Sequence, residues 1–235
     1  MQDMIFIIAE IGVNWDGDFD LAKEMMTKAK EAGCDAVKFQ AFNEEIVKEH
    51  PERSRLMKSA ISNGNIETID RIARSIEIEW FCTPMYTKAV DILDPYVHRF
   101  KIREKDGQSL LKNENSDLIE RVLKTNKEVI VSSASSPKNS DYYKNSDIKW
   151  LYCVPKYPCA LNDLNFRDIK DFDGYSNHCP SIVAPLAAAI LGTKILEIHA
   201  TSNKSKNFFD NNVSFDYAEL MTLIKLIRDS EKIVS

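Results

Sequence analysis

The stretch MIFIIAEIGVNWDGDFDLAKEMMTKAKEAGCDAVKFQAF (residues 4–42) contains one complete strand–helix–strand pattern. Its first apolar run, 4–12, is short and continuous, as in a strand that is buried on both faces. The segment from Phe19 to Ala32 is amphipathic with helical spacing and is followed by Gly33, a residue typical of helix ends. A second apolar run, 35–42, predicts the next strand. We therefore expect two parallel strands joined by a helix.

The same alternation continues to the end of the chain. Further strands are predicted at 78–84, 98–102, 128–133, 149–154, 173–177 and 194–200. Helices are predicted at 66–75, 88–94, 116–124, 181–191 and 216–228, with short helices near 140–143 and 165–170. Eight such units favour an α/β fold of the closed (β/α)₈ TIM barrel type over an open doubly wound sheet. Residues 1–235 are expected to form one catalytic barrel domain.

Composition narrows the class of protein further. Of the 235 residues, 44% are hydrophobic, which is enough to bury a large core and too many for a disordered chain. The net charge of −5 is mild and mixed in sign, which argues against a nucleic acid or membrane partner. The apolar start reads as a first strand rather than as a signal peptide. Five unclustered cysteines indicate reduced thiols and a cytoplasmic protein.

Polar side chains gather where the predicted strands end. In this fold the carboxyl ends of the strands form the active-site mouth, so these residues are expected to face one another. Side chains that alternate along a strand share a face, which places Lys38 beside Gln40 and Glu197 beside His199. The strand-end residues are Glu10, Asn14, Lys38, Gln40, Thr83, Lys101, Ser132, Ser133, Lys156, Tyr157, Ser176, His178, Glu197 and His199.

These residue types suit the binding of a phosphate and a metal. Lys38 and Lys101 lie inside apolar strands, where an ammonium is costly to bury, so they predict an anion site or, alternatively, internal salt bridges. His178 and His199 end adjacent strands and predict a pair of ligands for a divalent metal; two hydrogen-bonded core histidines are the alternative. Together the cations, hydroxyls and imidazoles favour a phosphate-plus-metal enzyme.

Six blocks of the sequence resemble, in order, the N-acetylneuraminate (sialic acid) synthase family. The resemblance implies a barrel that condenses phosphoenolpyruvate (PEP) with an N-acylated sugar aldehyde to give a nonulosonic acid, a transferase reaction of class EC 2.5.1. The first and last blocks are the most specific. The blocks are IAEIGVNWDGDFDLAKEMMTKAKEAGCDAVKFQAF (8–42), FCTP (81–84), FKI (100–102), VIVSS (129–133), YCVPKYP (152–158) and GYSNHCPSIVAPLAAAILGTKILEIHAT (174–201).

The resemblance also implies roles for individual residues. The phosphate and carboxylate of PEP would be held by Lys38, Lys101, Ser132 and Ser176, with Thr83 on the same substrate side. His178 and His199 would ligate a divalent metal, usually Mn²⁺, with Mg²⁺ or Co²⁺ possible, that polarises the aldehyde. The residues that would line the sugar side and take part in catalysis are Glu10, Gln40, Tyr157 and Asp210.

Two motifs depart from the family pattern. The fourth strand continues as KIREKD, so that Glu104 stands where a phosphate-binding serine is usual. A carboxylate repels a phosphate unless Arg103 or Lys105 neutralises it. In the sixth-strand motif Pro155 replaces a polar residue and supplies no donor, although Lys156 beside it could restore a cation.

Other features leave the assembly and the substrate open. The C-terminal antifreeze-like domain of bacterial synthases is missing from this chain, which suggests a separate antifreeze-like protein as partner; a homodimer is also expected. Trp15 either stacks on a sugar or covers the barrel mouth, and His50 and His98 are interpreted as structural or surface residues. Two alternatives to the synthase are a metal-dependent barrel lyase or aldolase acting on another oxoacid, and a degenerate partner of a full-length synthase. The sequence does not name the sugar.

Overall fold

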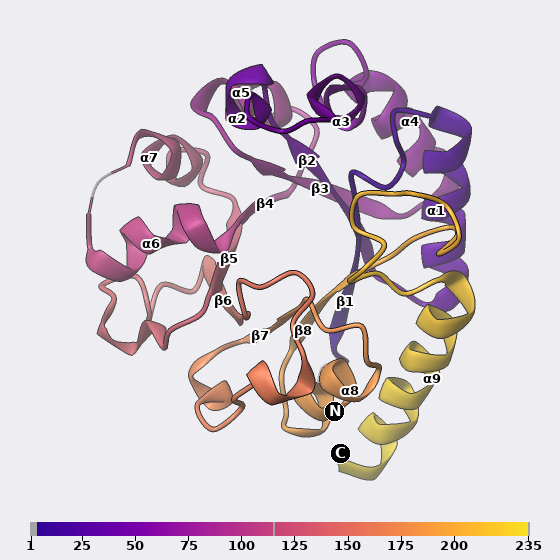
Figure 1. Ribbon diagram of the computed structural model, residues 1–235. Helices are drawn as coiled ribbons and strands as arrows, with labels where there is room; N and C mark the ends of the chain where they lie inside the picture. Colours follow the sequence, from indigo (N-terminus) through magenta and orange to yellow (C-terminus); the bar gives the residue numbers. More distant parts are fainter. Residues whose placement is uncertain (1–3, 115, 235) are drawn as a thin grey trace.

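The computed structural model describes residues 4–114 and 116–234 and shows a closed barrel of eight parallel strands (Figure 1). Each strand pairs with the next along the chain, and β8 pairs with β1 to close the barrel. The predicted TIM barrel is therefore confirmed. The strands are β1 (Phe6–Gly12), β2 (Ala36–Ala41), β3 (Glu79–Pro84), β4 (Arg99–Ile102), β5 (Glu128–Ser133), β6 (Ile148–Tyr152), β7 (Gly174–Asn177) and β8 (Ile195–His199).

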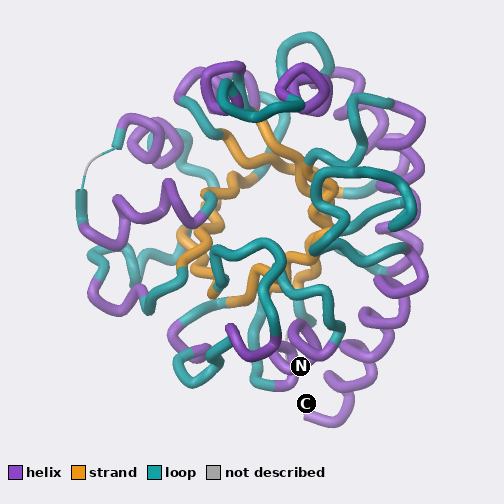
Figure 2. Tube along the Cα trace, viewed as in Figure 1, coloured by secondary structure: helices purple, strands orange, loops and turns teal. Residues whose placement is uncertain are grey.

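Helices form the outer ring around these strands (Figure 2). The α-helices are α1 (Phe19–Ala32), α2 (Glu44–Val47), α3 (Arg53–Ser59), α4 (Ile66–Ile76), α5 (Thr87–Leu93), α6 (Glu104–Lys112), α7 (Asp117–Leu123), α8 (Val183–Ile190) and α9 (Tyr217–Val234). The 3₁₀ helices are η1 (Pro137–Asn139), η2 (Leu161–Asp163) and η3 (Ile169–Asp171). None of the described helices is long and apolar enough to cross a membrane.

The first strand–helix–strand unit shows how local sequence sets the frame. Asp18 begins α1 by accepting hydrogen bonds from the backbone N–H groups of Asp20 and Leu21, and Gly33 ends it with a left-handed φ of 97°. The buried face of α1 packs on the barrel through Met25 and Met26. The predicted helix bounds agree with the observed ones because both helix-end signals are local.

Strand register brings the polar strand ends to one level. Glu10 lies opposite Lys38 of β2 on one side and opposite His199 of β8 on the other. Ser176 of β7 lies opposite Glu197 of β8. Parallel strands end at the same edge of the sheet, so these five side chains meet at the carboxyl end of the barrel, as the sequence predicts.

Several elements differ from the prediction, among them α2 and α3, which lie in a passage without predicted helices. Residues 104–112 form α6, a helix that the sequence analysis did not predict, because the segment EKDGQSLLK has few apolar residues to mark a buried face. Its Gly107 lies so close to β5 that an added Cβ would be 2.8 Å from Val131 Cγ1. The helix expected at 140–143 is a turn, and only the 3₁₀ helix η3 overlaps the helix expected at 165–170.

Candidate active site

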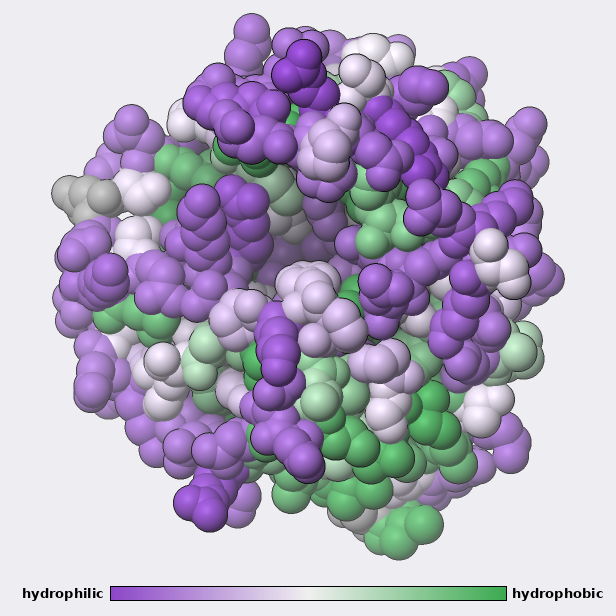
Figure 3. All heavy atoms as spheres, in the orientation of Figure 1, coloured by the Kyte–Doolittle hydropathy of each residue, from purple (hydrophilic) through white to green (hydrophobic). Residues whose placement is uncertain are grey.

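A cavity of about 550 Å³ opens at the carboxyl end of the barrel, within the range usual for small-molecule sites. In the space-filling view it is a hollow among hydrophilic side chains (Figure 3). All eleven residues that the sequence analysis singled out for substrate, catalysis or metal line this one cavity: Glu10, Lys38, Gln40, Thr83, Lys101, Ser132, Tyr157, Ser176, His178, His199 and Asp210.

Two buried lysines form the floor of the cavity. Lys38 Nζ lies 2.8 Å from Glu10 Oε2 and 3.8 Å from Glu197 Oε2. Lys101 Nζ donates to Ser132 Oγ at 2.6 Å and lies 3.9 Å from Glu197 Oε2. The internal salt bridges raised as one alternative are present, and both lysines also line the cavity, so the anion site stays a prediction.

Burial and neighbouring charge act differently on the two lysines. Burial works against the ammonium of Lys38, but the carboxylates of Glu10 and Glu197 outweigh it and raise its pKa. For Lys101 burial prevails and lowers the pKa, with only partial compensation from Glu197. Burial therefore favours the neutral amine of Lys101, and a nearby anion would shift the balance toward the ammonium.

Glu197 is a site residue to which the sequence analysis assigned no role. It is buried at the centre of the lysine pair, and Ser176 Oγ donates to its Oε1 at 2.9 Å. Burial opposes its ionisation, yet Lys101 and Lys38 lower its pKa. Its position on the same face of β8 as His199 was the available signal, but the strand pattern does not show that the side chain lies between two lysines.

His178 is held as a neutral imidazole. Its Nδ1 lies 2.7 Å from the carbonyl oxygen of Val154, and its Nε2 lies 2.7 Å from the hydroxyl of Tyr157. Burial, with a contribution from nearby His199, lowers the pKa of His178 to about 4. With Nδ1–H donating to the carbonyl, Nε2 accepts the hydrogen bond from the Tyr157 hydroxyl, and a metal would have to take over this lone pair.

His199 lies on the same side of the cavity, with its ring centroid 5.6 Å from that of His178. Its buried Nδ1 has no hydrogen-bond partner and lies 3.5 Å from Asp210 Oδ2. Burial disfavours protonation, but Asp210 outweighs it and raises the pKa of His199. A second imidazole with an unsatisfied buried nitrogen fits a divalent cation in donor chemistry.

The described side chains do not form a complete metal cage. Among residues 4–114 and 116–234, no group of three or more histidine, cysteine, aspartate or glutamate side chains is arranged to hold a metal ion. A metal held by the two imidazoles would need substrate and water oxygens to complete its coordination. Catalytic sites commonly keep positions open in this way.

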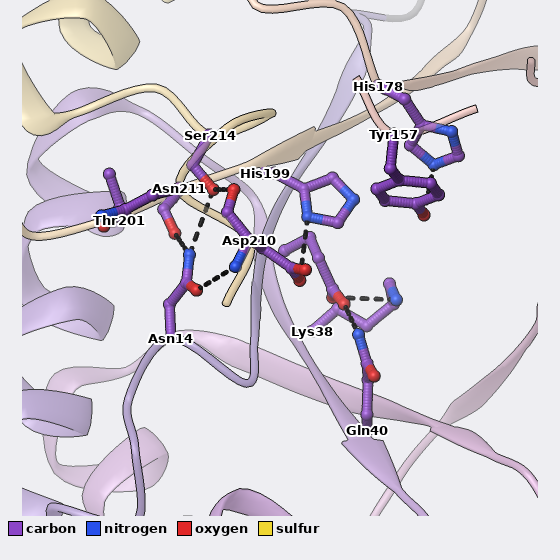
Figure 4. A network of polar contacts seen from close by, with 12 residues as sticks. Asn14, Lys38, Gln40, Tyr157, His178, His199, Thr201, Asp210, Asn211 and Ser214 are labelled. Carbon is purple, nitrogen blue, oxygen red and sulfur yellow. Dashed lines mark hydrogen bonds and ion pairs between the residues drawn. The ribbon is translucent and has the colours of Figure 1, made fainter. Parts of the chain in front are cut away.

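The loop that carries Asp210 is fixed from below by Asn14 (Figure 4). Asn14 Oδ1 accepts from the backbone N–H of Asp210 at 3.0 Å, and Asn14 Nδ2 donates to Ser214 Oγ at 3.1 Å. Ser214 Oγ donates to the carbonyl oxygen of Asp210 at 2.7 Å. The Asp210 carboxylate is thereby held beside His199 before any ligand binds.

Several expectations about neighbouring residues are wrong. Trp15 neither stacks in the cavity nor covers the mouth, because it is fully buried and its indole N–H donates to the carbonyl of Ser59. Lys156 pairs with Asp163 instead of replacing the donor lost at Pro155. These outcomes depend on chain segments far apart in sequence, which the local motifs do not reveal.

The charges at the start of α6 also differ from expectation. Arg103 pairs with Asp106, and Glu104 accepts a hydrogen bond from Gln108, so Arg103 does not neutralise Glu104. Arg103, Glu104 and Lys105 all line the cavity. Among the described residues at this rim, Lys105 is thus the cation without a carboxylate partner.

His50 was interpreted as a structural or surface residue; it is exposed, and it also lines the cavity rim. Its ring lies 5.6 Å from that of Phe209, in an edge contact. His50 belongs to the passage after β2 that carries α2 and α3. The sequence predicted that passage only as irregular, so it contained no signal for this contact.

Comparisons with known proteins agree with this geometry. The family model described as the NeuB family matches residues 25–235. An uncharacterized protein of Methanocaldococcus jannaschii is 34% identical, covering 97% of this chain and 72% of the relative. The N,N'-diacetyllegionaminic acid synthase of Legionella pneumophila is 30% identical over 97% of this chain and 73% of its own length. The crystal structure of N-acetylneuraminic acid synthetase from Leptospira borgpetersenii, in complex with citrate, superimposes with a TM-score of 0.85 at 26% identity, covering 99% of this chain and 86% of that one.

Proposed function

Because this chain belongs to the NeuB family, we propose that it is a synthase that joins PEP to an N-acylated sugar aldehyde and forms a nonulosonic acid. The observation that carries the proposal is the pairing of two features in one cavity. Lys38 and Lys101 form a buried cationic floor, and His178 and His199 place two imidazoles beside it. A phosphorylated donor and a carbonyl acceptor need these two kinds of group next to each other.

The floor accounts for binding of the donor. Lys38 and Lys101 spread the negative charge of the PEP phosphate and carboxylate, and the hydroxyls of Thr83, Ser132 and Ser176 add hydrogen bonds. Burial excludes water, which strengthens each of these interactions. The ammonium groups stay in place for the departing phosphate as well.

The opposite side accounts for the acceptor. His178 and His199 would hold a divalent cation, with Mn²⁺ as first choice, which supplies Lewis-acid polarisation of the acceptor aldehyde when bound. Asp210, fixed beside His199, and Glu10, which accepts from Gln40 Nε2 at 2.7 Å, orient acceptor hydroxyls and exchange protons with them. Tyr157 presents its hydroxyl at the same edge.

The reaction balances with water as the third reactant. The terminal carbon of PEP forms a bond to the aldehyde carbon, whose oxygen takes up a proton. Water adds to the carbon that carries the phosphate ester, and this carbon becomes the keto carbon when inorganic phosphate leaves. The residues described here therefore need only to orient two substrates, neutralise phosphate charge and move protons.

Release of inorganic phosphate from PEP tests the proposal. We expect phosphate release to require both Mn²⁺ and an N-acylated mannosamine-type or bacillosamine-derived sugar. His178→Ala and Lys38→Ala should each reduce the rate of release at least 100-fold. Loss of one charged group in a catalytic site has an effect of this size, roughly 10²–10³. His98→Ala and Lys144→Ala remove the same side-chain types from exposed positions and should retain activity. Failure of every sugar to support release, with the protein folded and Mn²⁺ bound, would contradict the synthase.

One observation favours a second candidate. Glu104 lines the cavity without a cationic partner, and a carboxylate there opposes a phosphate group. A metal-dependent lyase or aldolase acting on another oxoacid would not meet this repulsion. Formation of a free oxoacid from a sugar acid, with no use of PEP, would identify that activity.

A further inference from the structure

Two of the five cysteines meet beside the candidate active site. Cys159 lies in the loop after β6, Cys179 lies in the loop after β7, and all five cysteines are free thiols. The backbone N–H of Cys159 donates to the carbonyl oxygen of His178 at 3.0 Å, and a hydrogen bond joins the two thiols. We call Cys159 and Cys179 the thiol pair. Neither residue has a role in the binding or catalysis described above.

The thiol pair is buried beneath a thin, exposed loop. Cys159 is 2% exposed and Cys179 is 1% exposed. Every other residue from 155 to 162 is exposed, and the segment 153–160 contains no helix or strand. Such a segment opens at a lower cost in free energy than a strand of the barrel. Burial makes the thiols slow to react, but a small reagent can reach them by local opening, without unfolding of the barrel.

The two members of the pair are not held equally. Asn177 Nδ2 donates to the carbonyl oxygen of Cys179 at 2.8 Å, and the backbone N–H of Cys179 donates to Asn177 Oδ1 at 3.2 Å. The hydroxyl of Tyr175 donates to the same Oδ1 at 3.0 Å. Cys179 is therefore fixed to the end of β7, while Cys159 belongs to a loop that is exposed on both sides of it.

The thiol pair lies next to the contact that covers His178 Nε2. Tyr157 precedes Cys159 by two residues, and His178 directly precedes Cys179. The Tyr157 hydroxyl lies 2.7 Å from His178 Nε2, and the two ring centroids are 4.0 Å apart (Figure 4). A metal can use this nitrogen only after the Tyr157 hydroxyl has moved away. The position of the loop 153–160 therefore controls whether His178 is available as a ligand.

We propose that the thiol pair is a site of reversible oxidation, and that its disulfide blocks metal binding at His178. The inference rests on the metal site of the function proposed above. A disulfide places its sulfur atoms about 2.05 Å apart, closer than two thiols in contact. It would tie the loop that carries Tyr157 to the fixed loop that carries Cys179. Tyr157 would then stay on His178 Nε2.

Hydrogen peroxide is the oxidant of this step. One thiol is oxidised to a sulfenic acid with release of water, and the other thiol attacks that sulfur and releases a second water. Both S–H bonds and the O–O bond break, an S–S bond forms, and two electrons pass from sulfur to oxygen. A dithiol reductant reverses the reaction by thiol–disulfide exchange and is itself oxidised to a disulfide.

Comparison of the reduced and oxidised protein tests the inference. The full chain is treated with hydrogen peroxide, freed of it, and later treated with dithiothreitol. We expect oxidation to remove two hydrogen atoms from the intact mass and to link the peptides that contain Cys159 and Cys179. The affinity for Mn²⁺, measured by calorimetry, and the rate of phosphate release from PEP should both fall roughly 10–100-fold, the range for changes in groups that orient a metal ligand. Dithiothreitol should restore both quantities.

Three substitutions locate the effect. Cys159→Ala and Cys179→Ala each remove one member of the thiol pair. Cys34→Ala is the matched control, because Cys34 is also a buried free thiol but lies just before β2, at the opposite end of the barrel. The ratio of oxidised to reduced Mn²⁺ affinity within each variant cancels any effect of the substitution itself. This ratio should be close to one in both thiol-pair variants and should match the wild type in Cys34→Ala.

The remaining outcomes overturn the inference or separate it from the synthase. Addition of oxygen to Cys153, which lines the cavity, in place of a disulfide overturns it. A disulfide that leaves Mn²⁺ affinity unchanged, or a loss of affinity that persists in both thiol-pair variants, does so as well. A reduced protein that binds Mn²⁺ but releases no phosphate with any sugar contradicts the synthase, and the effect of oxidation on Mn²⁺ affinity then still decides the inference. A reduced protein that binds no Mn²⁺ contradicts the inference directly.

Discussion

At the scale of single residues, three polar side chains converge at Gly12, which has no Cβ to keep them apart. Gly12 ends β1 with a φ of 53°, and an added Cβ would lie 2.8 Å from Glu10 Oε1, 3.0 Å from Gln40 Nε2 and 3.3 Å from Asp210 Oδ2. These three groups line the proposed acceptor side of the candidate site. The glycine therefore serves the geometry of the site as well as the backbone conformation.

We predict that Gly12→Ala lowers the activity far more than it lowers the stability of the fold. The left-handed backbone should cost the folded protein about 1–2 kcal/mol. Phosphate release should fall much further, by at least 100-fold, because displacement of catalytic groups by about 1 Å has effects of roughly this size. Urea unfolding and the phosphate assay measure the two quantities.

The matched control is Gly192→Ala. Gly192 also has a positive φ, of 93°, but an added Cβ meets no atom within 4 Å. This variant should lose stability and keep its activity. Equal losses of activity in both variants would show that Gly12 acts only through the backbone.

Much of the candidate site follows from single residues and their spacing. Strand alternation and the barrel rule place Lys38, Lys101, His178 and His199 at one mouth, where the structure has them. Partner choice does not follow, because it depends on contacts across the barrel. The position of Glu197 between the lysines shows this limit.

At the scale of elements, helix ends are predictable and irregular passages are not. Asp18 and Gly33 bound α1 through local hydrogen bonds, so its limits can be read from the sequence. By contrast, only Leu110 and Leu111 of α6 are strongly apolar, and Gly107 lies so close to β5 that an added Cβ would clash with Val131. That contact depends on a distant segment and cannot be read from the helix sequence itself.

Contacts between elements also hold together the loops that border the proposed acceptor side. Arg55 of α3 connects the passage after β2 to the loop after β1 through Asp16, and to the loop after β8 through Asn207 and Phe209. A lysine keeps the charge but cannot make the forked contacts together. We predict that Arg55→Lys raises the KM for the sugar about tenfold, equivalent to roughly 1.4 kcal/mol, and leaves the KM for PEP unchanged.

Hydrogen exchange gives an independent measure of the same prediction. Amides in residues 44–59 should exchange faster in Arg55→Lys. In the wild type, local opening of this segment has to break the contacts of Arg55, and in the variant these contacts are absent. Arg74→Lys, in an exposed pair with Asp70 on α4, is the control and should alter neither quantity. Unchanged exchange in 44–59 would argue against a connecting role for Arg55.

At the scale of the whole molecule, the floor of the site exists only when the barrel is closed. Lys38 comes from β2, Lys101 from β4, Ser132 from β5 and Glu197 from β8, so the proposed anion site assembles from strands around the circumference. The unfolded chain cannot reproduce it. Binding of PEP should therefore stabilise the entire fold.

We predict that PEP at 100 times its dissociation constant stabilises the protein by about 2.7 kcal/mol. For a chain of this size that corresponds to a rise in melting temperature of roughly 5–10 °C. Lys101→Met should lose most of the rise, because it removes an ammonium from the floor while preserving apolar bulk. Lys127→Met is the control. Lys127 lies just before β5, at the opposite end of the barrel, and contacts the backbone carbonyl oxygens of Asp94 and Val97. This variant should retain the rise in melting temperature. If PEP raises the melting temperature of neither the wild type nor Lys127→Met, the lysine floor does not bind PEP. If Lys101→Met and Lys127→Met lose the rise equally, the stabilisation reflects the general charge of the protein and not the closed barrel mouth.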